Sequence, residues 1–510
     1  MSAKTLQKLY AIHELSEKRA YSRWINKVLA NDPDCRQYLP LDPYGDDIYD
    51  KVQDGVILCK LLNISLPGAI DERTMNRGQR LLNYAQKMEN LALVLNAARC
   101  RGCSMGNADI NDIYAGVKYA TIDFIWQIIR IGFLHDVTFH NHPEIVELKK
   151  VGDSLDDLRE QSSHDIIIRY ANYHLSKSGM RNFVNDYDDD FKDCLVYAHL
   201  TYRVAPATIR GKMISPTNIT RERCVEARAR NIIRNLEELG AESFLTEDDI
   251  INGFERRDSC SKLHLCTIGY LFKHFNGDLS VHRPVYRTKN NSGNGECLEE
   301  LTCRNFLNSF DVYPFCNHVL NDCRNGWILG ELFEVLRPGY TSGVKFILDF
   351  DSNRIHAQRV HNCTKIVKLA QNYVLNTPNL DAEKIADSDK SSILGLIVEM
   401  MRAYVCRDNY IEKEILDWAN CQLRKSGKQS MMRSFGDRII AEDNLFAVVL
   451  ESVAPGLVDR SCLGNNKLLN AYYYVSIAHK AGIPVYTLPE HFVEGNAKFV
   501  ALAFATLMVY

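Results

Sequence analysis

The feature that most constrains this 510-residue chain is an order of sequence elements that recurs four times along it. Each copy opens with an aromatic residue, then a small or apolar residue, then asparagine. The four triplets begin at Trp24, Tyr170, Phe306 and Trp418. Their spacing is uneven and one such triplet carries no weight, so the repeat is established by the segments behind each triplet.

Behind each triplet comes a short apolar segment that ends at proline, in three cases with glycine directly after it. The prolines are Pro67, Pro206, Pro338 and Pro455. Proline beyond the last turn cannot continue a helix, and glycine supplies a left-handed exit. Each apolar segment is therefore predicted to be a helix that stops at its proline.

Two further helices complete each copy. Long amphipathic helices are predicted over 89–100, 224–239, 363–375 and 470–481, and closing helices over 121–131, 263–275, 392–404 and 499–510. The closing segments are apolar on nearly all sides, which is typical of a central core helix. Little of the chain alternates at period two, so strands should be scarce. The sequence therefore predicts an all-α fold of four domains.

Composition supports a globular protein and excludes several classes. The chain is 46% hydrophobic and 25% charged, which is typical of a globular protein. Its formal net charge is −3, so the chain as a whole is not a polycation of the kind that binds nucleic acid. Its most apolar run, at 120–131, is interrupted by Asp123, Gln127 and Arg130 and is too short to span a bilayer. Sixteen scattered cysteines and the lack of a signal-like N-terminus favour a cytoplasmic protein with reduced thiols. We expect no binding of nucleic acid and no membrane insertion.

The sequence resembles the calponin-homology family, and within it the fimbrins, also called plastins. The first repeat carries the most specific motifs: WINKVLANDPDC at 24–35, DGVILCKLLNISLPGAIDER at 54–73, ENLALVLNAA at 89–98 and IWQIIRIG at 125–132. The later repeats match by order of elements more than by identity. The resemblance implies an all-α fold of four calponin-homology domains, arranged as two tandem actin-binding units.

The repeats define a domain organisation. We expect repeats over 17–134, 163–277, 297–406 and 408–510, a connector over 135–162 and a linker over 278–296. The linker contains the polar, glycine-rich stretch KNNSGNGE. A short linker favours tight bundles over loose networks.

The chain departs from the family in its calcium-binding elements. The family usually carries two EF-hands before the first repeat, but only a short segment precedes it here. No complete EF-hand loop motif is present, and the nearest candidate, at 186–190, has Phe191 where the tight turn demands glycine. We therefore expect no direct calcium switch.

The resemblance also assigns candidate actin-binding residues. In the family the binding surface combines the first and last helices of the odd repeat with the first helix of the even repeat. The matching residues are Lys18, Arg19, Arg23, Lys27, Lys118, Tyr119, Arg130, Arg169 and Lys177 in the first pair, and Arg304, Lys390, Arg402 and Lys413 in the second.

Two patterns bear on these candidates, and each has a simpler explanation. Arg19, Arg23 and Lys27 recur at four-residue steps and share one helix face, which could equally be a solvated face. Two basic positions at the ends of the closing helix keep the same spacing in both odd repeats, which could equally reflect helix capping.

The expected function is calcium-independent binding and cross-linking of filamentous actin into tight bundles, by a monomer with two actin sites in the cytoskeleton. The alternative is a calponin-homology scaffold or microtubule-associated protein in which one or both pairs do not bind actin. Family membership does not decide between them, because one fold serves several functions.

Catalytic and metal-binding interpretations find little support. Cys100 and Cys103 form a CxxC with no second CxxC at zinc-ligand spacing. His135, His140, His142 and Glu144 cluster in the predicted connector, where chance clustering is the simpler interpretation. No P-loop, GxSxG, HExxH or GxGxxG fingerprint occurs. We expect no enzymatic activity, no cofactor and no metal.

Overall fold

The computed structural model describes the chain in segments separated by short gaps and one longer gap at 280–295. The described residues are 3–78, 81–105, 108–138, 141–150, 152–155, 158, 161–181, 183–185, 187, 189–252, 257–275, 277, 279, 296–310, 312, 315–348, 350–351, 354–373, 375, 377, 379–406 and 411–510. Over these residues the regular structure is entirely helical, and no strand occurs.

The chain divides into two compact units. The first comprises Met1–Gln53 and Asn111–Asn294, and the second comprises Asp54–Ile110 and Gly295–Tyr510. The middle of the first sequence repeat thus belongs to the same compact unit as the third and fourth repeats. The predicted linker at 278–296 lies almost wholly outside the described residues.

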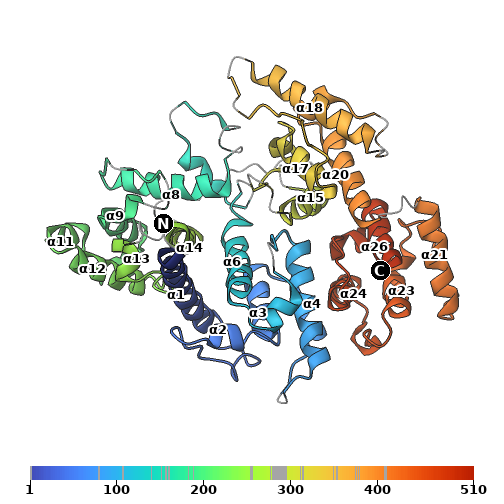
Figure 1. Ribbon diagram of the computed structural model, residues 1–510, viewed down its shortest axis with the longest axis horizontal. Coiled ribbons are helices and arrows are strands. Elements are labelled where there is room, and N and C mark those ends of the chain that lie inside the picture. Colours follow the sequence, from blue (N-terminus) through green and yellow to red (C-terminus); the bar gives the residue numbers. More distant parts are fainter. Residues whose placement is uncertain are drawn as a thin grey trace. The chain divides into compact units, whose positions relative to one another are not determined.

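The first unit is built around three long helices that pack on one another, α1 (Ala3–Val28), α6 (Lys118–Leu134) and α14 (Arg257–His274) (Figure 1). Its other elements are α2 (Asp47–Asp50), α5 (Ile110–Tyr114, which begins at the unit boundary), η2 (Pro143–Leu148), α8 (Ser163–Lys177), η3 (Asp189–Phe191), α9 (Leu195–Val204), α10 (Ala207–Arg210), α11 (Pro216–Arg221), α12 (Val225–Glu238) and α13 (Glu247–Asn252).

The second unit holds the remaining elements. These are α3 (Val56–Ser65), η1 (Glu72–Thr74), α4 (Tyr84–Cys100), α15 (Leu298–Asn308), α16 (Val319–Cys323), α17 (Trp327–Leu336), α18 (Ile355–Asn372), α19 (Ala382–Ala386), α20 (Lys390–Val405), α21 (Glu412–Lys425), α22 (Ile439–Glu442), α23 (Leu445–Val453), η5 (Arg460–Cys462), α24 (Lys467–Lys480), α25 (Pro489–Glu494) and α26 (Ala497–Val509). Figure 1 shows α4 beside α24, which it contacts along much of its length.

The predicted order of elements is present in every repeat, but three of the long amphipathic helices begin earlier than predicted, α24 by three residues and α4 and α18 by more. Helix α4 starts at Tyr84 because Asn83 and Gln86 form a reciprocal capping box in front of it. Helix α18 starts at Ile355, eight residues before the predicted start, and its polar first turns conceal the helical pattern.

The asparagine of the repeated triplet has the same structural role in all four repeats. In the first, Asn26 Nδ2 donates to the carbonyl of Leu41 (2.8 Å) and Asn26 Oδ1 accepts the N–H of the same residue (2.7 Å). The equivalent pairs are Asn172 with Val184, Asn308 with Cys316 and Asn420 with Met432. Each side chain thus satisfies both backbone groups of one loop residue and pins the loop to the first helix.

A second asparagine, on the long helix, pins the loop that leads into it. Asn362 Nδ2 donates to the carbonyls of Asn325 (3.0 Å) and Ile347 (2.9 Å), and its Oδ1 accepts the Ile347 N–H (2.9 Å). Asn90, Asn235 and Asn470 make the corresponding contacts in the other repeats. This second set was not predicted from the sequence.

The residue before each apolar helix lies in the left-handed region of backbone conformation. It is Gly55 (φ 79°), Cys194 (φ 70°), Gly326 (φ 76°) and Asn444 (φ 52°) in the four repeats. A Cβ on Gly55 would lie 2.8 Å from Asn90 Cβ, so the second asparagine also limits side-chain size here. The Asp-Gly entry of the first repeat is thereby explained, and Cys194 adopts the same conformation without the freedom of glycine.

We predict that Asn308→Ala destabilises the protein by about 2–4 kcal/mol, because the N–H and C=O of buried Cys316 lose their partner. Asn372→Ala, an exposed position at the end of α18, is the control and should change stability little. Thermal unfolding followed by circular dichroism measures both. Equal unfolding midpoints for the two variants would contradict a structural role for the asparagine.

Candidate functional site

The predicted cations of α1 face other elements of the first unit more than solvent. Arg19 is 9% exposed and pairs with the fully buried carboxylate of Asp249 on α13. Lys27 Nζ lies 3.1 Å from Glu242 and donates to the carbonyl of Gly240 (2.5 Å). These contacts join the first helix of repeat one to repeat two.

The remaining α1 candidates are also partly enclosed. Lys18 is 8% exposed, and its Nζ lies 3.6 Å from Asp46 and 3.3 Å from the carbonyl of Tyr44. Arg23 is half-buried. The four-residue spacing thus correctly places basic residues on one face, but that face is largely packed.

The start of α6 is more open. Tyr119 is 67% exposed, and Lys118 is exposed although its Nζ lies 3.1 Å from Asp46. The hydrogen bond from Lys118 holds the pKa of the Asp46 carboxyl below its usual value. Arg130, near the other end of α6, is half-buried and hydrogen-bonds Gln127.

Of the two candidates on α8, one is paired with a carboxylate and the other is exposed. Arg169 NH1 lies 2.6 Å from Asp153, so the guanidinium anchors the connector to repeat two. Lys177 is exposed, with its ammonium 5.3 Å from the centre of the Tyr173 ring. In the first unit, Lys118, Tyr119 and Lys177 are therefore exposed, as is Lys27, whose ammonium is held by Gly240 and Glu242 of repeat two.

In the second unit, Arg304 is an internal residue. Its side chain is 3% exposed and forms two charge-assisted hydrogen bonds to Glu296, of 2.6 and 2.8 Å. Lys390 is half-exposed at the start of α20, with Nζ 2.6 Å from Glu300 and 3.2 Å from Cys297 Sγ. The Glu300 carboxylate raises the pKa of Lys390 well above its usual value.

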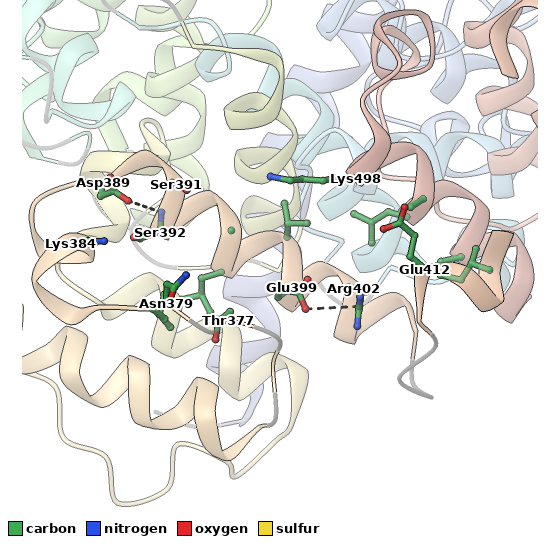
Figure 2. A pocket seen from close by; sticks show the side chains of 18 residues that line it. Thr377, Asn379, Lys384, Asp389, Ser391, Ser392, Glu399, Arg402, Glu412 and Lys498 are labelled. Carbon is green, nitrogen blue, oxygen red and sulfur yellow. Dashed lines mark hydrogen bonds and ion pairs between the residues drawn. The ribbon is translucent and has the colours of Figure 1, made fainter. Parts of the chain in front are cut away.

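Arg402 and Lys413 are the least constrained candidates of the second unit. Arg402 has only a loose contact with Glu399, at 3.9 Å, and Lys413 is exposed on α21. Arg402 also lines a groove of about 540 Å³ that α20, α21 and α26 enclose with the 377–389 segment (Figure 2).

The groove is lined by both apolar and charged side chains. The apolar ones include Leu396, Ile415, Ala501, Leu502 and Ala505. A Cβ on Gly395 would meet nothing within 4 Å, so the middle of α20 is open on this side. Glu399, Arg402 and Glu412 stand at its rim in Figure 2. The groove arises from three helices distant in sequence, so no sequence motif indicates it.

A second set of polar contacts, also missed from the sequence, joins residues 54–110 to repeat four. Arg73 donates to the carbonyls of Cys462 (2.7 Å) and Leu469 (3.0 Å) and lies over the Tyr473 ring. Lys480 Nζ lies 3.3 Å from Glu89, and Asn96 Nδ2 donates to the carbonyl of His479 (3.0 Å). These contacts explain why the middle of repeat one belongs to the second unit.

The cysteine and histidine candidates have structural environments. Cys100 and Cys103 are both buried, and burial raises the pKa of the Cys100 thiol. His140 lies outside the described residues. Within the described part of the chain, no three His, Cys, Asp or Glu side chains are placed to hold a metal ion. The same residues include no helix that is long and apolar enough to cross a bilayer.

His142 belongs to an ion-pair cluster in the connector. Its Nδ1 lies 3.0 Å from Glu144 and its Nε2 4.0 Å from Asp136, which Lys273 also approaches at 3.9 Å. The ring packs against Phe272. Burial lowers the pKa of His142, but the hydrogen bonds to Asp136 and Glu144 outweigh burial and raise it above 6.5.

We predict a pH-dependent contribution of His142 to stability. Because its folded-state pKa is raised, the contribution is complete below pH 6.5 and is lost as the pH rises through the folded-state pKa. His142→Gln should therefore lower the unfolding temperature more at pH 6 than at pH 8.5. Differential scanning calorimetry of both proteins measures this, and a difference that is constant with pH would rule the contribution out.

Comparison with known proteins places these features in a family. The calponin homology (CH) domain model matches residues 15–133, 161–277, 299–406 and 410–510. Fimbrin-3 of Arabidopsis thaliana is 30% identical over 98% of this chain and 70% of its own. Plastin-3 of Homo sapiens is 30% identical over 96% of this chain and 79% of its own.

A solved structure matches nearly the whole chain. The actin-crosslinking core of Schizosaccharomyces pombe fimbrin has 27% sequence identity and a TM-score of 0.81, and the match covers 97% of this chain and 100% of that one. The predicted all-α fold of four CH domains is thus confirmed. The chain belongs to the fimbrin and plastin family of calponin-homology proteins.

Proposed function

We propose that the chain binds filamentous actin through two tandem CH pairs and cross-links filaments into tight bundles. The observation that carries this proposal is the match to the whole actin-crosslinking core of a fimbrin, across all four domains. Two binding pairs in one monomer are sufficient, because capture of a second filament is a separate event on the same molecule.

The contacts favour some candidate residues over others. An acidic filament surface requires accessible cations that do not hold two repeats together, and we select Lys118 and Lys177 in the first unit and Lys390, half-buried Arg402 and Lys413 in the second. Tyr119 adds exposed apolar area beside Lys118. We assign the actin contact to these six residues.

The other candidates have a different relation to actin. Arg169 and Arg304 pair with carboxylates just before their own domains, Asp153 in the connector and Glu296 at the end of the linker. Arg19 is buried against Asp249 and could reach actin only after α1 separates from α13. Lys27 is exposed, but its ammonium is held by Gly240 and Glu242 of repeat two. This engagement of α1 is the observation that supports the alternative function, in which one pair does not bind actin.

We predict that Arg402→Glu/Lys413→Glu abolishes bundling and spares single-filament binding. Charge reversal should weaken the second pair roughly tenfold by adding repulsion from an acidic surface. Actin should then pellet with the variant at high speed but no longer at low speed. Arg433→Glu/Arg438→Glu, at exposed positions outside the assigned helices, is the matched control and should bundle normally.

The same assay tests the function itself. If the wild-type chain fails to pellet actin at low speed, the bundling function is wrong. If it bundles and both double variants lose bundling equally, the site assignment is wrong. Lys118→Glu/Lys177→Glu gives the corresponding test of the first pair, and unchanged bundling would favour the alternative function.

We predict that calcium does not alter bundling by this chain, because its sequence contains no EF-hand loop. Low-speed pelleting should be equal in excess EGTA and in about 10⁻⁵ M free calcium, a concentration that loads sensor EF-hands. A calcium-dependent change in the pelleted actin would overturn calcium independence and leave the bundling result intact.

A further inference from the structure

The third CH domain carries a run of positive charge that the proposed actin contacts do not use. Helix α18 contains no Asp or Glu over its 18 residues, although the chain as a whole is slightly acidic. Together with the segment before it, the helix forms what we term the basic stripe. The stripe consists of Arg337, Lys345, His361, Lys365 and Lys368, with Leu348 among them.

Hydrogen bonds hold the preceding segment antiparallel to α18. Tyr340 Oη donates to the carbonyl of Leu369 (2.9 Å) near the end of the helix. The Lys365 ammonium donates to the carbonyl of Lys345 one turn earlier, and the Ile347 N–H donates to Asn362 Oδ1 (2.9 Å). Arg337, Lys345 and Leu348 therefore lie alongside the 361–369 part of α18.

Two described cations of the stripe contact aromatic rings. Arg337 lies over the Tyr340 ring (5.6 Å) and Lys365 over the Phe346 ring (5.8 Å). Within the described part of the chain, Arg337, Lys345, Lys365 and Lys368 make no ion pair. Most of the candidate actin-binding cations do have a carboxylate neighbour, which makes the stripe a distinct surface.

Two acidic groups near the stripe are engaged elsewhere. The Glu334 carboxylate accepts hydrogen bonds from the Thr341 hydroxyl (2.6 Å) and from the N–H groups of Thr341 and Gly339. Asp387 pairs with His356 (2.9 Å). Neither of these two carboxylates therefore pairs with a lysine or arginine of the stripe.

Leu348 gives the stripe an apolar element. Its side chain is 63% exposed, although the neighbouring Phe346 and Tyr340 are half-buried. An isolated exposed leucine needs no explanation. An exposed leucine on a segment that lies beside several cations matches the chemistry of surfaces that adsorb to anionic bilayers, where cations meet headgroups and an aliphatic side chain enters the interface.

We propose that the basic stripe binds the surface of an anionic membrane. Three of its four cations outside His361 are lysines, whose compact ammonium groups act as point charges and need no fixed partner geometry, which suits lipid headgroups. A nucleic acid would favour exposed aromatic rings for stacking, and the aromatic rings here are half-buried. The contact is peripheral, because the stripe adsorbs to one leaflet and no described helix spans a bilayer.

Membrane binding by the stripe goes beyond the proposed actin function. The six residues assigned to actin lie on α6, α8, α20 and α21, whereas the stripe lies on α18 and the segment before it. A chain that uses both kinds of surface could hold a filament bundle against a membrane.

The test is flotation of the full chain, without actin, with vesicles of phosphatidylcholine alone or with added phosphatidylserine and phosphatidylinositol bisphosphate. Each cation near an anionic surface contributes about fivefold to partitioning, so Lys365→Gln/Lys368→Gln should reduce binding roughly 25-fold. Leu348→Ser should reduce it several-fold. Lys149→Gln/Lys150→Gln removes the same charge from an exposed site in the connector and should bind as wild type.

The outcomes separate membrane binding from other roles of the stripe. Binding that requires anionic lipid, falls in both stripe variants and persists in the control supports the proposal. Absence of anion-dependent flotation by the wild type, or an equal loss in the control, overturns it. So does a stripe variant that loses actin co-sedimentation while its vesicle binding is unchanged, since the stripe would then be an actin contact. Circular dichroism melts verify that each variant is folded.

Discussion

The architecture depends on one constraint: buried backbone groups in loops need hydrogen-bond partners. A CH domain joins its helices by long loops that lie against the core, where water cannot satisfy them. Asparagine meets this need because its carboxamide offers a donor and an acceptor side by side. It can therefore pair with both the N–H and the C=O of one loop residue, as the backbone of a neighbouring β-strand does in a sheet. In every repeat one such asparagine sits on the first helix and another on the long helix. The two together fix the loops and so the positions of the helices that carry binding residues.

This constraint explains why the order of elements was predictable and the details were not. The triplet asparagine was visible because an aromatic core residue precedes it. The second asparagine, exemplified by Asn362, sits among other polar residues and has no such marker. Its presence is nonetheless reflected in Gly55 and Gly326, which must be small to let the asparagine approach. The sequence alone marks these glycines as helix entries, and their contact partner is clear only in three dimensions.

The candidate site was less predictable. The sequence shows which residues are basic, but only the fold shows which of them pair with carboxylates. Arg19 and Asp249 are 230 positions apart, and Arg304 is satisfied by Glu296 at the edge of the predicted linker. No periodicity identifies either partner. By contrast Lys177 and Lys413 lie on outward helix faces, where amphipathic spacing alone predicts exposure. Sequence reasoning therefore indicated which helices carry basic residues and could not rank those residues by exposure.

The distribution of paired and unpaired charge then separates stability from recognition. A cation with a close carboxylate partner at low exposure has lost its hydration already, so moving it to a new partner gains little. An exposed cation without a partner keeps its field available to an approaching anionic surface. By this criterion Arg19 of α1 chiefly stabilises the first unit, whereas exposed Lys413 of α21 and Lys368 of α18 make no ion pair among the described residues. Surfaces with exposed, unpaired cations allow a protein of low net charge to bind a polyanion.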